Sequence, residues 1–219
     1  DVYKRQTWVC WKIEETANGR KTKRPINPNT GSYAKSNDSS TWSDYETAVE
    51  MSKNFDGIGF MLGDGIFGID IDGVEKEIQE YLANEDVDNI VGEFIETMES
   101  YAEISPSGKG IHILVKGELP KGGRRRGNVE MYEELRFLTF TGFRIGRFKE
   151  IAVDEMGKIN YLHNKYIAQP ESETKQINTT KGTGNDLSAE ELIDIAKKSK
   201  NGLRFTTLFE GDWTQFYDS

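Results

Sequence analysis

Hydrophobic and polar positions alternate in short runs along the first 140 residues, which predicts a strand-rich domain. Runs of strand length occupy 7–12, 57–62, 66–71, 101–104, 111–116, 129–132 and 137–141. The segment Gly-Asp-Gly at 63–65 has strong turn chemistry and predicts a β-hairpin between the runs on either side. The polar segment 18–40 includes Pro25, Pro28 and Gly31 and predicts a long loop or a series of turns.

Other segments space their apolar residues at helical intervals. Residues 43–54 and 188–200 each begin with the Ser-x-x-Glu pattern of a capping box. Residues 75–100 also have helical spacing, and we expect a break near 84–88. Because these helices are interleaved with the strands, the pattern predicts an α/β (α+β) core.

The pattern also divides the chain. Between 169 and 186 the residues are mainly Ser, Thr, Lys, Asn, Glu and Gly, which is typical of a flexible linker. We therefore expect one main domain at 7–168, and at 187–219 the beginning of a helical domain that this chain does not complete. Residues 1–6 have no usable periodicity, and we interpret them as an assembly scar.

Composition limits the classes of protein that the chain can represent. Its 219 residues are 36% hydrophobic and 30% charged, enough for one sizeable core. The apolar runs are far shorter than the roughly 20 residues that cross a bilayer, so we expect a cytoplasmic protein with no membrane partner. The single cysteine, Cys10, lies between two tryptophans and predicts a buried apolar side chain rather than a disulfide or a zinc ligand.

The net charge of −9 is unfavourable for binding DNA, because phosphate contacts require Lys and Arg. The basic residues are nevertheless concentrated in two clusters: Arg20, Lys21, Lys23 and Arg24, and then Lys121, Arg124, Arg125 and Arg126. A solvated loop explains either cluster by itself. If the chain binds nucleic acid, these clusters are where we expect the strand to lie.

Two aspartates stand two residues apart in a strand pattern. Asp70 and Asp72 therefore point to one face of the strand, while Ile69 and Ile71 point to the other. Carboxylate oxygens at this spacing suit Mg²⁺ or Mn²⁺, and two such ions can clamp the attacking and leaving oxygens of a phosphoryl transfer. The pair alone is equally consistent with solvated carboxylates, and Asp-Ile-Asp-Gly-Val also resembles the first motif of haloacid-dehalogenase-type phosphatases.

A glycine-rich turn, Ser-Pro-Ser-Gly-Lys-Gly at 105–110, leads into the strand predicted at 111–116. The groups that can contact phosphate oxygens here belong to Ser107, Gly108, Lys109, Gly110 and His112. Backbone amides, an ammonium group and an imidazole can together cradle a triphosphate. The segment is not a Walker A loop, because a glycine and a strand follow Lys109 in place of Ser or Thr and a helix.

A third element combines Glu130, whose neighbours Val129 and Met131 point to the opposite face, with Arg136 and the run Phe-Leu-Thr-Phe-Thr-Gly. A third carboxylate can complete a metal site. Each element has an ordinary structural explanation when taken alone: a surface acid, a satisfied histidine or a solvated arginine. Their joint order is what carries the functional prediction.

That order resembles the three motifs of archaeo-eukaryotic primases, in the version found in phage and mobile-element primase-polymerases. The likeness extends upstream to 8–12, 23–28 and 40–42, and so covers about 7–168. It implies a catalytic core with an RNA-recognition-motif-like sheet. Phage members of the family continue into a helical domain and then into a helicase further along. Residues 202–218 of this chain resemble the opening of that helical domain.

The resemblance also implies roles for individual residues. Asp70, Asp72 and Glu130 would hold two Mg²⁺ or Mn²⁺ ions, Lys109 and His112 would hold the incoming NTP or dNTP, and Arg136 would help to neutralise it. Glu130 stands where many relatives have aspartate. Gly110 stands where many have a serine, so that Ser107 would have to supply the hydroxyl contact.

The predicted reaction is template-directed nucleotidyl transfer on single-stranded or primed DNA during replication of a phage or mobile element. A 3′-hydroxyl activated by one metal would attack the α-phosphorus, while the second metal and Lys109 stabilise the departing pyrophosphate. The predicted partners are the DNA template, the nucleotide, and a helicase domain or protein beyond the C-terminus.

Two alternatives stay open at this point. A non-catalytic single-strand-binding replication module would need basic grooves and stacking aromatics but no metal. A haloacid-dehalogenase-type phosphatase would use Asp70 as nucleophile and Asp72 as acid and base. The phosphatase would leave the Ser-Gly-Lys-Gly-Ile-His run unexplained.

Overall fold

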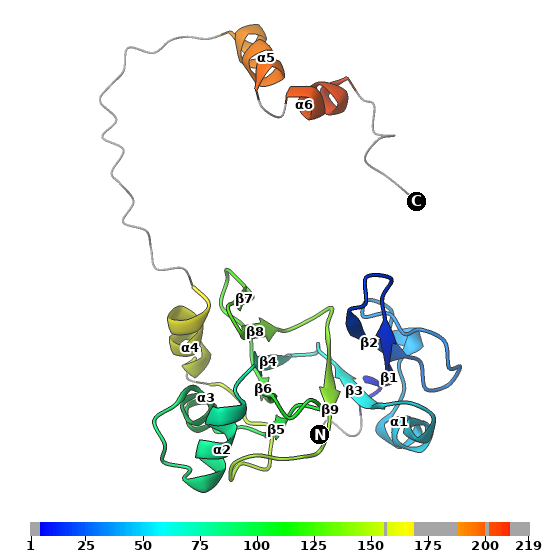
Figure 1. The fold of residues 1–219 in the computed structure, drawn as a ribbon, viewed down its shortest axis with the longest axis vertical. Coiled ribbons are helices and arrows are strands. Elements are labelled where there is room, and N and C mark those ends of the chain that lie inside the picture. The colour runs from blue at the N-terminus through cyan, green and yellow to red at the C-terminus, as the bar shows by residue number, and fades with distance from the viewer. Residues whose placement is uncertain (1–4, 156, 169–187, 200–201, 211–219) are drawn as a thin grey trace. The chain divides into compact units, whose positions relative to one another are not determined.

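The computed structural model describes residues 5–155, 157–168, 188–199 and 202–210. The chain divides near residue 170 into two compact units (Figure 1), and we describe each unit by itself. The predicted linker at 169–186 and residues 1–4 lie outside the described residues, so the predictions made for them stay predictions. No helix in the described part of the chain is long and apolar enough to span a bilayer.

The first unit contains two antiparallel sheets. The four-stranded sheet has the order β2 (Lys21–Ile26), β1 (Trp8–Glu15), β3 (Gly57–Met61), β9 (Phe137–Phe140). The five-stranded sheet has the order β5 (Ala102–Ile104), β6 (Gly110–Lys116), β4 (Ile66–Asp72), β8 (Val129–Tyr132), β7 (Arg125–Arg126). This mixture of helices and antiparallel sheets confirms the predicted α+β class.

One face of the five-stranded sheet is covered by helices α2 (Glu75–Ala83), α3 (Ile90–Met98) and α4 (Lys158–Tyr166), which Figure 1 shows beside it. The main core forms between them. Ile69 and Ile71 of β4 and Ile113 of β6 are fully buried there against apolar side chains of α2 and α3. The alternation predicted for β4 is therefore real, and its other residues point away from the helices.

The opposite face of the five-stranded sheet packs against the four-stranded sheet. A second core cluster joins Phe60 of β3 and Leu138 of β9 to Leu114 of β6. The sheets are in close contact at Gly68, where a Cβ atom would lie 2.3 Å from Leu138 Cδ1. A side chain at position 68 would have to displace the Leu138 side chain from the space between the sheets beside Asp70.

Short helices complete the first unit: α1 (Tyr45–Met51) and the 3₁₀ turns η2 (Ser39–Thr41) and η3 (Ser52–Asn54). The sulfur of Cys10 lies 3.4 Å from the carbonyl oxygen of Ala48 in α1. Burial raises the pKa of this thiol to about 11. The prediction of a buried, apolar cysteine is confirmed.

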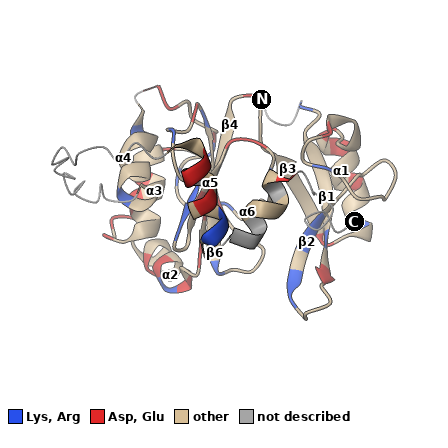
Figure 2. Ribbon diagram, turned by 90° about the horizontal axis from the view of Figure 1, so that it is seen from above, with Lys and Arg blue, Asp and Glu red and all other residues tan. Residues whose placement is uncertain are grey.

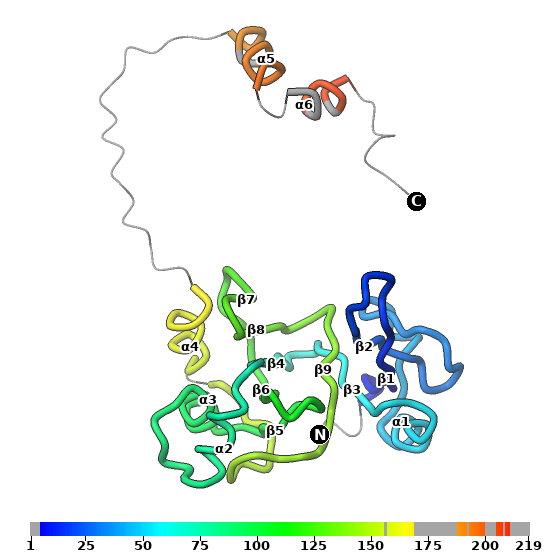
Figure 3. The backbone as a smooth tube through the Cα atoms, viewed as in Figure 1, coloured from blue at the N-terminus to red at the C-terminus, as the bar shows by residue number. Residues whose placement is uncertain are grey.

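Three local predictions were wrong. β3 and β4 belong to different sheets, so the turn at 63–65 does not close a hairpin. Figure 3 follows the backbone from β3 to β4. Residues 21–26, expected in a loop, form β2 because they pair along their whole length with β1. Asp44, not Ser43, caps α1, since its carboxylate accepts a hydrogen bond from Thr47 N at 2.8 Å.

The second unit contains α5 (Ala189–Lys198) and α6 (Gly202–Phe209). The capping box predicted at Ser188 and Glu191 is confirmed, with both reciprocal hydrogen bonds present. The aromatic residues beyond 210 lie outside the described residues.

Candidate active site

A row of polar side chains crosses all five strands of the second sheet at one level. Its members are paired directly in the strand register: Glu103 with His112, His112 with Asp70, Asp70 with Glu130, and Glu130 with Arg125. Three of these residues were predicted from separate motifs as far as 60 positions apart in the sequence. The row lies on the face away from the helices, because the sequence neighbours of Asp70, His112 and Glu130 belong to the core.

Asp70 lies at the centre of the row, in an environment that disfavours its charge. Burial raises the pKa of its carboxyl above the ordinary value, and the charges of Asp72 and Glu130 raise it further, while His112 and Lys23 act in the opposite direction. Its Oδ1 atom is buried and accepts no hydrogen bond from the described residues. The imidazole of His112 faces it, with Nε2 3.7 Å from Asp70 Oδ1.

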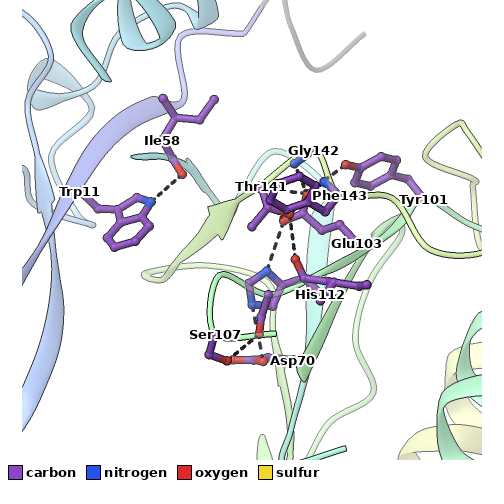
Figure 4. Close-up of polar contacts among 12 residues, drawn as sticks. Trp11, Ile58, Asp70, Tyr101, Glu103, Ser107, His112, Thr141, Gly142 and Phe143 are labelled. Atoms are coloured by element: carbon purple, nitrogen blue, oxygen red, sulfur yellow. Dashed lines mark hydrogen bonds and ion pairs between the residues drawn. The ribbon is translucent and has the colours of Figure 1, made fainter. Parts of the chain in front are cut away.

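His112 is held between two carboxylates, as Figure 4 shows. It is 4% exposed, and its Nδ1 lies 3.4 Å from Glu103 Oε1. The Glu103 carboxylate also accepts hydrogen bonds from Tyr101 Oη at 2.9 Å and from the amides of Thr141 and Gly142 at 3.0 Å. A carboxylate oxygen accepts hydrogen bonds, so the contact with Glu103 favours a hydrogen on Nδ1 of the imidazole and leaves Nε2 directed towards Asp70.

The predicted metal ligands share a face but are not gathered around one point. Among the described residues, no three His, Cys, Asp or Glu side chains are arranged to hold a metal ion. Glu130 instead pairs with Arg125 at 2.9 Å. The donor chemistry nevertheless fits a hard divalent cation, because Asp70 Oδ1 is buried without a hydrogen-bond partner among the described residues, and two other carboxylates raise its pKa.

The glycine-rich turn leads into the first residue of β6, next to Asp72. Gly110 is paired with Asp72 in the register, and a Cβ atom at Gly110 would lie 2.5 Å from the carbonyl oxygen of Ile71. A side chain at position 110 would therefore collide with the backbone of β4. The Ser107 hydroxyl accepts a hydrogen bond from Lys109 N at 3.2 Å, so it is engaged within the turn.

The predicted phosphate-binding cations are at the surface. Lys109 Nζ pairs with Glu75 Oε1 at 2.9 Å, and both side chains are more than half exposed. An exposed ion pair of this kind is worth about 0–1 kcal/mol, so Glu75 holds the Lys109 side chain only weakly. Arg136 stacks over the ring of Tyr132, with its guanidinium carbon 4.5 Å from the ring centre.

The two basic clusters differ in how they are used. Arg20, Lys21 and Lys23 make no ion pair within the described part of the chain, and Figure 2 shows the positive charge on β2. Arg24 pairs with Glu14 at 3.5 Å. Lys23 lies over the indole of Trp11, 5.7 Å from the ring centre, and its charge reaches Asp70.

The second cluster is mostly used inside the protein. Arg124 pairs with Glu133 at 2.7 Å and donates to the carbonyl oxygen of Pro120. Arg126 donates to the carbonyl oxygen of Ala168, while Arg125 holds Glu130. Lys121 makes no ion pair with any described residue.

Comparison with known proteins relates the chain to a family. No protein-family model matches the chain. A DNA primase-polymerase of Nitratiruptor phage NrS-1 is 32% identical to it over 206 residues, which cover 87% of this chain and 26% of that protein. The chain carries a phage-type primase-polymerase domain. It spans about a quarter of the length of this relative, and the resemblance predicted from the motifs is confirmed.

Two members of the row in this primase-polymerase domain were not given their observed roles by the sequence. Glu103 was missed, although its position between Ala102 and Ile104 already marks a charged residue on the non-core face of a strand. Arg125 was assigned to nucleic acid only, and its contact with Glu130 depends on the pairing of β7 with β8.

Proposed function

We propose that this domain catalyses template-directed nucleotidyl transfer as a DNA primase, a DNA polymerase or both. The observation that carries the proposal is the row Glu103, His112, Asp70, Glu130 and Arg125, which brings one residue from each of the three primase-like motifs to one face of one sheet. The homologous phage protein bears the name DNA primase-polymerase, which supports this reading over a phosphatase. The expected substrates are a DNA template and an NTP or dNTP.

Asp70, Asp72 and Glu130 would hold two Mg²⁺ or Mn²⁺ ions. When bound, such ions neutralise the charge that develops on the transferring phosphate and activate the attacking oxygen. The protein contributes the acceptor oxygens, since Asp70 Oδ1 is buried and accepts no hydrogen bond within the described residues. Glu130 would have to leave Arg125 in order to join the aspartates.

The remaining residues would bind and orient the nucleotide. His112 presents Nε2 to the centre of the row, and Lys109 and the turn amides border the Asp72 end. These groups would hold the triphosphate, with Arg136 adding positive charge beside Tyr132. Arg20, Lys21 and Lys23 offer exposed positive charge for the template. Catalysis would then depend mainly on positioning and charge neutralisation.

The test is incorporation of labelled nucleotides on primed and unprimed single-stranded templates with Mg²⁺ or Mn²⁺. The control is the double variant Asp70→Ala, Asp72→Ala. We expect product from the wild type alone, with similar DNA binding by both proteins. Equal, metal-independent DNA binding without any product would instead support the non-catalytic binding module, and a trapped phospho-aspartate would support the phosphatase.

A helicase domain or protein beyond this chain is a further part of the proposal, as is primer initiation that depends on the helical unit. Both rest on the resemblance to phage primase-polymerases. Comparing initiation with extension in a longer protein tests the second point. Equal initiation by this chain and by the longer protein would rule out a requirement for the additional segment.

A further inference from the structure

An exposed aromatic side chain and an unpaired arginine lie beside the glycine-rich turn, outside the motifs discussed so far. Phe143 is 71% exposed, the highest value for any large hydrophobic residue in the described part of the chain. Arg144 is exposed and makes no ion pair with a described residue, and its guanidinium has only a 3.5 Å hydrogen bond to the carbonyl oxygen of Arg147. Neither residue contributes to the core of the domain.

These two residues border an open pocket of about 550 Å³. One wall is the start of the glycine-rich turn, and the other is the loop that follows β9. The pocket is lined by Ile104, Ser105, Pro106, Gly108, Gly142, Phe143 and Arg144. Its surface is mainly apolar, with the arginine at its edge, which suits a flat aromatic ring attached to an anionic group.

The loop that carries Phe143 is held firmly in place. Thr141 Oγ1 donates to the carbonyl oxygen of Ile104 at 2.8 Å, and Ile104 N donates to the carbonyl oxygen of Phe143 at 2.8 Å. The Glu103 carboxylate accepts the amides of Thr141 and Gly142 while it contacts His112 (Figure 4). The backbone that carries the exposed ring is therefore fixed relative to the candidate active site.

We propose that Phe143 and Arg144 form a binding platform for one nucleotide unit of a DNA strand, with a base stacked on the Phe143 ring and its phosphate at Arg144. Base stacking on aromatics and phosphate contact by arginine are the usual means of binding single strands. The pocket shares Ser105 and Gly108 with the turn predicted to bind the triphosphate. The inference rests on the proposed function, because a template-copying enzyme must hold a strand beside its incoming nucleotide.

The test measures binding of a fluorescent single-stranded oligonucleotide to the 219-residue chain by anisotropy, without divalent metal. Phe143→Ala should weaken binding by about fivefold to a hundredfold, and Phe143→Trp should restore it. Arg144→Ala should lower the slope of log affinity against log salt by about 0.7. Tyr161→Ala, which removes an exposed aromatic from α4 behind the sheet, should have no effect.

Parallel titrations distinguish the sources of the base. A loss seen with the unprimed strand identifies the template, and a loss seen only with a primed duplex identifies the primer end. Either result supports the platform. A loss of binding that is confined to free dNTP overturns the platform. Unchanged strand binding by Phe143→Ala also overturns it, even if that variant changes self-association in sedimentation.

The same samples separate this inference from the proposed function. If the wild type incorporates nucleotides and Phe143→Ala binds DNA equally well, the platform is wrong and the polymerase stands. If the Asp70→Ala, Asp72→Ala protein binds DNA normally and the wild type makes no product, the polymerase is wrong. Thermal melting of each variant checks that it is folded.

Discussion

The two faces of the five-stranded sheet are made by alternate residues of the same strands, but they have opposite properties. On the helix side, Ile69 and Ile71 are fully buried in the main core. On the other side, Asp70 lies between them in the sequence and carries a buried oxygen that has no hydrogen-bond partner among the described residues. Apolar burial on the first face stabilises the fold, whereas the buried and clustered charges on the second face destabilise it.

The largest difference between the two faces should appear when Asp70 is replaced. Asp70→Asn should reduce nucleotide incorporation by on the order of 10³-fold, because a carboxylate needed for charge neutralisation is lost. The same change should stabilise the fold at neutral pH. Because the pKa of Asp70 is raised on folding, its contribution to stability is full below the unfolded value of 3.8 and is lost as pH rises through the folded value.

Melting temperatures of wild type and Asp70→Asn, measured in a chelator at several pH values, check this stability effect. The melting temperature of the variant should rise relative to that of the wild type as the pH increases above the pKa that Asp70 has in the unfolded chain. A difference that does not change with pH would contradict the electrostatic account of this face.

A substitution on the helix side should have the opposite effect, with a large loss of stability and little change in activity. Phe94→Ala removes a fully buried ring of α3 and should cost about 3–5 kcal/mol of unfolding free energy. Urea unfolding measures that loss, and incorporation is compared per folded molecule at low temperature. We expect the activity of the folded fraction to change less than about twofold, and a loss as large as that of Asp70→Asn would break the distinction between the faces.

Glu103 sharpens the comparison, because it is buried like a core residue but belongs to the polar face. Glu103→Gln should lower kcat/KM by about 10–100-fold by misdirecting His112. Imidazole ¹⁵N NMR checks the cause, since the Nδ1 hydrogen of His112 should lose its carboxylate partner. The signals of His163, which contacts the carbonyl oxygen of Gly123, are the internal control and should not move.

The smallest effect is expected at the edge of the row. Arg125→Ala removes an exposed partner of Glu130 and should tighten Mn²⁺ binding by up to about fivefold, because an exposed ion pair is worth about 0–1 kcal/mol. Electron paramagnetic resonance of free Mn²⁺ measures the affinity. Weaker binding in the variant would mean that Arg125 orients Glu130 for the metal instead of competing with it.

The sequence by itself determined most of the elements and the identity of the central site residues. Periodicity correctly located β4, β6, β8 and the break between α2 and α3, because alternation and helical spacing are local consequences of burying one face. The order of the three motifs gave the family, which the homologous phage protein confirms. The ligand assignments of Asp70, Asp72 and Glu130 stay predictions.

Only the tertiary structure decided which strands pair and which residues the site residues contact. The turn at 63–65 was read as a hairpin, but β3 and β4 separate because each finds its partners elsewhere in the chain. Glu103, His112, Asp70, Glu130 and Arg125 form one row only because the register of five strands aligns them. Strand pairing joins residues distant in sequence, and local patterns carry no information about register between such strands.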